Sequence, residues 1–82
     1  MPQASQVHQW MISYLGELLD LPEADIDPEA HLANYGLDST DVMVIAGALE
    51  EQFSLEVDPI FFLRNATVKD IVDDLKNSGI VG

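Results

Sequence analysis

Along the 82-residue chain, hydrophobic side chains recur at three- and four-residue steps in four segments, a spacing typical of amphipathic helices. The pattern predicts helices over about 4–19 and 39–53, a short helix beginning at Asp58–Pro59 and a last helix beginning at Thr67. No stretch alternates with the two-residue period of a strand. We therefore predict an all-α fold, a small four-helix bundle with a long first loop and a short third helix, forming a single domain over residues 1–82.

The apolar positions of each segment define the expected core. The first helix contributes a stripe in which Trp10 and Tyr14 are interpreted as core residues. Three positions of the second helix, Met43, Val44 and Gly47, fall off its stripe; they are either half-buried beside a neighbouring helix or form a contact patch framed by acids. The predicted stripes are Val7, Trp10, Met11, Tyr14, Leu15, Leu18 and Leu19 in the first helix, Val42, Ile45, Ala46, Leu49 and Phe53 in the second, and Val68, Ile71, Val72 and Leu75 in the fourth.

The third helix and the long loop carry apolar residues that a simple stripe does not accommodate. Residues 60–63 are all apolar, so at least one side chain is expected to be exposed or to line a pocket. Phe53, Phe61 and Phe62 are candidates either to fill or to line the space between the second and third helices. In the loop over 22–38, four apolar side chains are expected to hold the chain against the helices: Ile26, Leu32, Tyr35 and Leu37.

The charge of the chain is strongly one-sided. Fifteen Asp and Glu face three Lys and Arg, the formal net charge is −12, and the first basic residue is Arg64. Such a surface repels phosphate backbones, so neither nucleic acid nor an anionic membrane is expected as a partner. It either keeps the protein in solution or docks basic partners, and the complete absence of bases before Arg64 favours docking.

Composition excludes several other classes of protein. A hydrophobic content of 48% is too high for an acidic disordered tail. The chain has no cysteine, which excludes disulfides, a thiol nucleophile and a zinc-thiolate site. Its longest apolar run, Val42–Leu49, is much shorter than a membrane span, and no secretory signal is visible. We therefore expect a cytoplasmic protein without membrane insertion.

The sequence offers few catalytic groups. His8 and His31 are the only histidines, and neither has neighbours that suggest a serine–histidine–acid arrangement or a metal site. Residues 36–40 read Gly-Leu-Asp-Ser-Thr, which is not the nucleophile elbow of hydrolases. We expect no independent catalysis and no metal.

A calcium loop is the one metal-binding alternative. Asp25, Asp27 and Glu29 alternate like the start of such a loop. Ala30 then stands where glycine is needed, and Gly36 stands where the bidentate glutamate belongs. Calcium binding therefore stays a minor hypothesis.

Ser39 is the candidate site that position singles out. Asp38 is a suitable N-cap for the second helix, and Asp41 follows three residues later as in a capping box. Ser39 then lies exposed on the first turn. A phosphate attached there would face free backbone N–H groups and the positive end of the helix dipole.

The segment Tyr35-Gly36-Leu37-Asp38-Ser39, followed by an acidic helix that ends Leu-Glu-Glu-Gln-Phe over 49–53, resembles an acyl carrier protein. The resemblance covers nearly the whole chain and includes the long first loop and the short third helix. It implies a four-helix bundle without catalytic activity. It also implies that Ser39 bears 4′-phosphopantetheine, transferred from coenzyme A by a phosphopantetheinyl transferase, and that acyl groups are held on the arm as thioesters.

The same resemblance implies a set of partner-recognition residues on the second helix. Basic patches on the transferase, on an acyl-loading ligase or acyltransferase, and on ketosynthases or other synthase enzymes would dock a monomeric carrier there. The residues at the matching positions are Asp38, Thr40, Asp41, Met43, Gly47, Glu50 and Glu51.

Several positions depart from the commonest carrier pattern. Thr40 replaces a larger apolar residue, Val44 replaces a glutamate, and residues 60–64 are apolar and basic where fatty-acid carriers are acidic. These departures and the overall acidity favour a discrete, stand-alone carrier of polyketide or other specialised-metabolite biosynthesis. A housekeeping fatty-acid carrier, a peptidyl or aminoacyl carrier, and an acidic helical interaction module without a prosthetic group stay open as alternatives, and the sequence leaves the acyl cargo undetermined.

Overall fold

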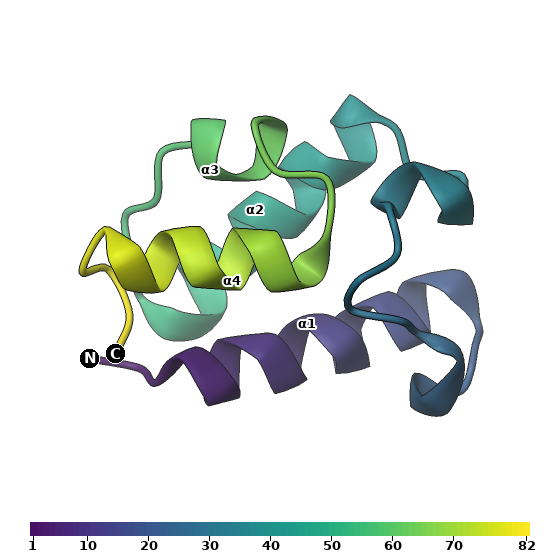
Figure 1. The fold of residues 1–82 in the computed structure, drawn as a ribbon, viewed down its shortest axis with the longest axis horizontal. Helices are drawn as coiled ribbons and strands as arrows, with labels where there is room; N and C mark the ends of the chain where they lie inside the picture. The colour runs from purple at the N-terminus through teal and green to yellow at the C-terminus, as the bar shows by residue number, and fades with distance from the viewer.

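The computed structural model describes residues 1–82, and its regular structure is entirely helical. The elements in chain order are α1 (Ala4–Leu19), η1 (Glu23–Asp25), η2 (Leu32–Tyr35), α2 (Ser39–Phe53), α3 (Ile60–Leu63) and α4 (Val68–Asn77), where η marks a 3₁₀-helix. In Figure 1, α4 lies between α1 and α3, with α2 behind them. The predicted fold class is confirmed, and α1 and α2 have the bounds that periodicity predicted.

One apolar cluster of 17 buried residues forms the core. It takes side chains from all four α-helices and from the loops between them. The stripes predicted for the second and fourth helices are confirmed, except that Phe53 is only partly buried. The largest fully buried side chains are Phe62, Met11, Leu15, Ile45, Leu49, Ile71 and Leu75.

The buried face of α1 differs from the predicted stripe. Leu18 is 48% exposed, whereas Ile12, which the stripe left out, is 8% exposed. The face is centred on Met11 and Leu15 and extends toward Ile12, so its opposite edge leaves Trp10 and Tyr14 only partly buried. These two aromatic residues pack against the core without being enclosed by it, which corrects their interpretation as plain core residues.

The chain leaves α1 through a tight reversal. The Leu21 N–H donates to the Gly16 carbonyl at 2.9 Å, and Asp20 adopts a left-handed conformation with φ of 55°. A β-carbon at Gly16 would lie 3.0 Å from the Leu21 carbonyl oxygen. Glycine at position 16 therefore allows the chain to fold back closely over the end of α1.

The long loop contains two 3₁₀ turns that the sequence pattern did not predict. Ile26 and Leu32 are buried as expected, and the Tyr35 hydroxyl accepts a hydrogen bond from the Asp27 N–H at 2.8 Å. Backbone hydrogen bonds join the loop to the start of α4: the Leu32 N–H donates to the Ala66 carbonyl at 2.8 Å, and the Lys69 N–H donates to the Pro28 carbonyl at 3.0 Å. The loop is thus held in place by both apolar burial and backbone pairing.

The third helix is a single turn, held by the burial of one side chain and by a hydrogen bond at its start. Phe62 is buried at 2% exposure, while Ile60 and Leu63 are 46% and 52% exposed, so the expectation that not all four residues face inward is confirmed. The Asp58 carboxylate accepts a hydrogen bond from the Ile60 N–H at 3.0 Å at the start of the turn. A helix this short is unstable alone, so its place depends on tertiary contacts.

The last helix begins after Thr67, whose hydroxyl accepts a hydrogen bond from the Asp70 N–H at 3.1 Å. It ends before Gly79, which has a φ of 77°. Beyond it, the Ala4 N–H donates to the Gly82 carbonyl and the Gly82 N–H donates to the Pro2 carbonyl, so the first and last residues lie side by side (Figure 1). None of the helices is both long and apolar enough to cross a bilayer.

Phe62 is the anchor of α3, which gives a stability prediction. Replacing Phe62 by Ala should lower the free energy of unfolding by about 3–5 kcal/mol, because a buried phenyl ring is lost and a cavity is left. Replacing the neighbouring, half-exposed Leu63 by Ala should cost less than about 1 kcal/mol. Urea unfolding followed by circular dichroism measures both. Equal losses in the two variants would contradict the anchoring role.

Candidate functional site

The start of α2 is fixed by two carboxylates that cap it reciprocally. The Asp41 N–H donates to Asp38 Oδ1 at 3.0 Å, and the Asp38 N–H donates to Asp41 Oδ2 at 3.1 Å. The sequence-based capping prediction is therefore confirmed. The hydrogen bond from the Asp41 N–H lowers the pKa of the Asp38 carboxyl below its usual value. The two reciprocal hydrogen bonds hold the first turn of α2 in a fixed shape.

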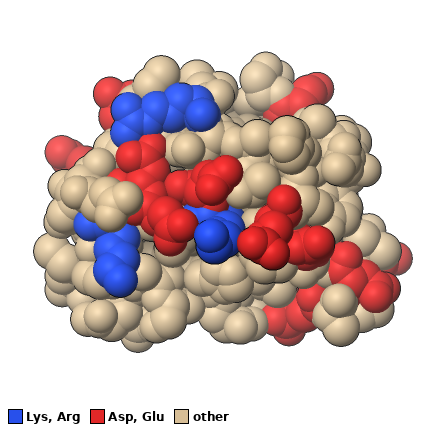
Figure 2. All heavy atoms as spheres, in the orientation of Figure 1, with Lys and Arg blue, Asp and Glu red and all other residues tan.

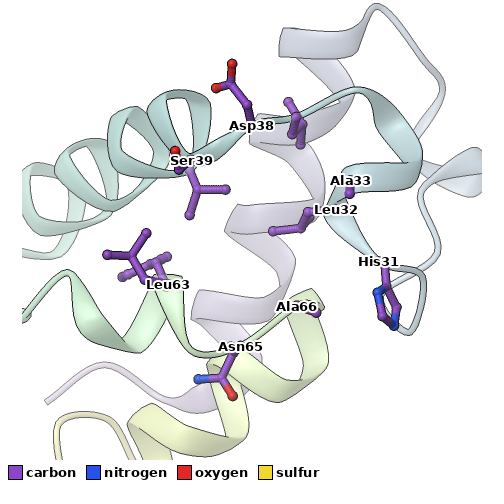
Figure 3. Close-up of a pocket in the computed structure, with 11 residues that line it drawn as sticks. His31, Leu32, Ala33, Asp38, Ser39, Leu63, Asn65 and Ala66 are labelled. Atoms are coloured by element: carbon purple, nitrogen blue, oxygen red, sulfur yellow. The ribbon is translucent and has the colours of Figure 1, made fainter.

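Ser39 lies on this first turn with an exposed side chain. No hydrogen bond joins its hydroxyl to another group of the chain, and no general base lies beside it. His31, the nearest histidine to the site, lies at the opposite rim of the adjoining cavity (Figure 3). The serine is thus accessible and unactivated, which suits a residue modified by another protein better than a nucleophile acting alone.

A cavity of about 180 Å³ adjoins Ser39, between the start of α2, α3 and the η2 segment. In Figure 3, Leu32 and Leu63 extend toward this space, while the Asp38 carboxylate points away from it. The buried Phe62 side chain forms part of the wall, whereas Phe53 lies elsewhere, against Trp10. The cavity is small, mostly apolar and next to the exposed hydroxyl.

Most of the recognition residues expected on α2 are exposed, and two of them are partly buried. Thr40, Met43, Gly47 and Glu51 are exposed, and a β-carbon at Gly47 would meet no atom within 4 Å. Glu50 is partly buried. Asp41 is also partly buried, and one of its carboxylate oxygens is engaged by the Asp38 N–H, so it is less free for a partner than the sequence suggested.

Exposed apolar side chains border these acids. Met43 and Val44 on α2 are 40% and 55% exposed. Of the two interpretations, half-burial beside a neighbouring helix or an uncovered contact patch, this exposure favours the patch. Ile60 and Leu63 on α3 are exposed as well. Side chains of this kind with acids beside them are typical of protein-binding surfaces. No group of three or more His, Asp or Glu side chains lies close enough to hold a metal ion, so the aspartates of the calcium alternative are not gathered.

Ionic pairing inside the chain is confined to residues 64–74. Arg64 pairs with Asp74 at 2.6 Å, and Lys69 approaches Asp73 at 3.9 Å. The face in Figure 2 shows Lys and Arg atoms interspersed with Asp and Glu atoms. The carboxylates of α2 have no ion pair within the chain, so their charge is available to an external cation.

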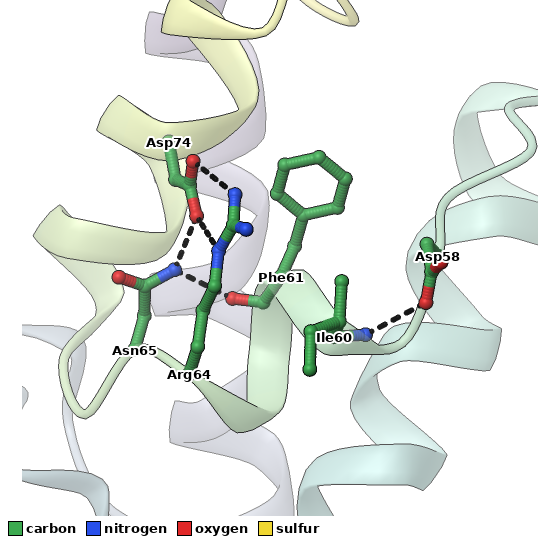
Figure 4. A network of polar contacts seen from close by, with 6 residues as sticks. All are labelled: Asp58, Ile60, Phe61, Arg64, Asn65 and Asp74. Carbon is green, nitrogen blue, oxygen red and sulfur yellow. Dashed lines mark hydrogen bonds and ion pairs between the residues drawn. The ribbon is translucent and has the colours of Figure 1, made fainter.

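A polar network that the sequence analysis missed holds α3 against α4 (Figure 4). Arg64 donates from Nε and Nη2 to the two carboxylate oxygens of Asp74, at 2.6 and 2.7 Å. The Asn65 amide donates to Asp74 and to the Phe61 carbonyl, both at 2.7 Å. The Arg64 guanidinium also lies 4.7 Å from the centre of the Phe61 ring. The network fixes the wall of the cavity that α3 supplies.

The residues of this network are distant in sequence, and no local motif pairs them. The sole sequence signal was that Arg64 is the only arginine of an acidic chain. The hydrogen bonds from Arg64 and then Asn65 lower the pKa of the Asp74 carboxyl, and the bond to Asp74 raises the pKa of Arg64.

Comparison with known proteins gives consistent matches. Residues 9–75 match the family described as the phosphopantetheine attachment site. The chain is 31% identical over 64 residues to a subunit of the phenolphthiocerol/phthiocerol polyketide synthase of Mycobacterium tuberculosis and of Mycobacterium bovis, which covers 78% of this chain and 3% of that protein. It is 28% identical over 69 residues to the non-reducing polyketide synthase albA of Aspergillus niger, covering 84% of this chain and 3% of the synthase. The chain thus spans a small part of the length of these relatives.

The Asp74 network predicts a particular dependence of stability on pH. A carboxyl whose folded pKa is lowered stabilises the fold fully above its unfolded pKa, about 3.9, and loses that contribution as pH falls through the folded pKa. Asp74→Asn should therefore be less stable than the wild type by a constant amount above about pH 5, and the difference should shrink below about pH 4.

Urea unfolding at a series of pH values measures this difference. Asp73→Asn is the matched control, since Asp73 is exposed and only approaches Lys69 at 3.9 Å. It should show a small difference with little pH dependence. A gap between wild type and Asp74→Asn that persists unchanged to pH values well below 3.9 would show that the network does not act through this carboxylate.

Proposed function

The chain belongs to the phosphopantetheine-attachment family of carrier domains, and on this premise we propose that residues 1–82 form one acyl carrier domain that bears its prosthetic group on Ser39. The family match establishes 4′-phosphopantetheine as the cofactor and supports a carrier role without catalysis. The observation that carries the assignment of Ser39 is its position: an exposed, unpaired hydroxyl on the first turn of a capped helix, beside a cavity.

The residues around Ser39 fit the group. A phosphodiester on this hydroxyl would face the N-terminal end of the α2 dipole, which favours a negative charge. The fixed Asp38–Asp41 capping box keeps the turn rigid and presents the serine outward. When bound, the group supplies a thiol on which acyl groups are carried as thioesters. The chain itself needs no cysteine and no base beside the serine, since the transferase provides activation.

The exposed surface of α2 supports docking of basic partner enzymes. Glu50 and Glu51 contribute charge without internal ion pairs, and Met43 and Gly47 lie exposed between them and Ser39. Charges at an interface rim act mainly on the rate of encounter, so such docking should be fast, transient and sensitive to salt. The expected partners are a phosphopantetheinyl transferase, an acyl-loading ligase or acyltransferase, and a ketosynthase or other synthase enzyme.

The pathway proposed is polyketide or related specialised-metabolite biosynthesis. The support is the similarity to short regions of polyketide synthases from bacteria and fungi, together with the apolar and basic third-helix region. Fatty-acid, peptidyl and aminoacyl carriers use the same arm and stay as alternatives. The cytoplasmic location, the monomeric state and the stand-alone character expected from the sequence remain predictions.

Loading of Ser39 is tested by intact mass spectrometry after incubation with coenzyme A and a broad-specificity phosphopantetheinyl transferase. The wild type should gain one phosphopantetheine and Ser39→Ala none. In Ser39→Ala the free energy of unfolding should change by less than about 0.5 kcal/mol, because the Ser39 side chain is exposed. Ser5→Ala, an exposed serine in the first turn of α1, is the matched control and should load fully. Loading of Ser39→Ala would refute the assignment.

The docking surface is tested by transferase kinetics with Met43→Ala. Because Met43 is an exposed apolar side chain between Ser39 and the acids, its loss should lower kcat/KM by about threefold to tenfold with unchanged stability. Leu21→Ala removes a side chain of nearly equal exposure, 38% against 40%, from the loop after α1. If both variants lose the same activity, or neither loses any, Met43 does not take part in docking.

A further inference from the structure

A second surface feature lies between α1 and α2, apart from the cavity at Ser39. It is an open groove of about 470 Å³ at the end of α2 that is remote from Ser39. We call it the aromatic groove. Its lining residues are Trp10, Tyr14 and Glu17 from α1 and Ala48, Glu51 and Gln52 from α2.

Aromatic rings form one side of this groove in a fixed arrangement. Trp10 and Tyr14 are stacked, with ring centres 5.0 Å apart and planes inclined by 26°. Phe53 meets Trp10 edge-on at 6.0 Å and 77°. All three pack against the core and are partly buried, so the rings keep a defined orientation. The face of an indole or phenol ring carries negative charge density that attracts a cation.

Two carboxylates from facing helices complete the groove. The side-chain carboxylates of Glu17 and Glu51 form no ion pair and no hydrogen bond within the chain. No Lys or Arg precedes position 64, and the ion pairs of the chain join residues 64–74 to one another. Neither the indole N–H of Trp10 nor the hydroxyl of Tyr14 has a partner in the chain. The groove thus combines two aromatic side chains and negative charge with no internal cation.

From this arrangement we infer that the aromatic groove binds an arginine side chain presented by a basic partner protein. The planar guanidinium stacks on aromatic rings and donates in pairs to carboxylates, whereas the ammonium of lysine is a compact, strongly hydrated charge. The net charge of −12 attracts such a partner from solution. At a rise of about 1.5 Å per residue, Glu51 lies about 18 Å along α2 from Ser39. The groove is therefore separate from the proposed attachment site and does not depend on the prosthetic group.

Trp10 is the only tryptophan of the chain, so intrinsic fluorescence reports directly on the aromatic groove. The experiment titrates the unmodified protein at low salt with a short capped peptide containing two arginines between glycines. Matched peptides carry lysine or glutamine in place of arginine. The arginine peptide should change Trp10 fluorescence to saturation, the lysine peptide should bind several-fold more weakly, and the glutamine peptide should not bind.

Charge-neutral variants locate the interaction. Glu17→Gln and Glu51→Gln should each lower the affinity for the arginine peptide by about twofold to fivefold, as expected for the loss of one exposed ionic contact. Asp73→Asn removes the same charge from α4 and should leave the affinity unchanged. Three results would overturn the inference. They are the absence of a saturable change in Trp10 fluorescence, equal affinity for the lysine and arginine peptides, and a loss of affinity in Asp73→Asn equal to that in the two glutamate variants. Because the protein is unmodified and no transferase is present, these outcomes are independent of whether Ser39 is loaded.

Discussion

One apolar core has to hold together a chain whose first 63 residues contain no positive side chain. Like charges spread over the surface oppose compaction, and residues 1–63 have no internal cation with which to offset that repulsion. Stability therefore rests on burial, above all on the large side chains at the centre of the cluster. This constraint also explains the surface. Acidic side chains that form no ion pair inside the molecule stay exposed and can interact with positively charged partners.

The only arginine of the chain stabilises its shortest α-helix. The third helix is one turn long and buries one large side chain fully, so burial alone contributes little to holding it in place. Arg64 supplies the rest through its bidentate pairing with Asp74 and its position over Phe61. Leu32 in η2 and Ala66 in the segment after α3 both line the cavity at Ser39, and a backbone hydrogen bond joins them. The shape of the cavity thus depends on contacts far from the serine in sequence.

Periodicity and capping predicted most of the fold because both are local. The bounds of α1 and α2 follow from apolar spacing, and the Asp38–Asp41 box follows from residues three apart. What the sequence did not predict is set by tertiary contacts. The burial of Ile12 in place of Leu18 depends on how α1 rotates against its neighbours. The Arg64–Asp74 pair spans ten residues without a motif, and the aromatic groove exists only once two helices are placed side by side.

Helical spacing shows how the two surfaces of α2 relate to each other. Ser39, Met43, Gly47 and Glu51 follow one another at four-residue steps, so they form a single row along the helix. Ala48 and Gln52 belong to the next row, on the side of α2 that contributes to the groove with α1. Glu51 is the member of the first row that also lines the groove. A partner that follows the row from Ser39 therefore reaches the aromatic groove at its end, and one carboxylate contributes to both contacts. An arginine held there would fix the direction in which a partner lies along α2, because the groove is at one end of the row and the serine is at the other.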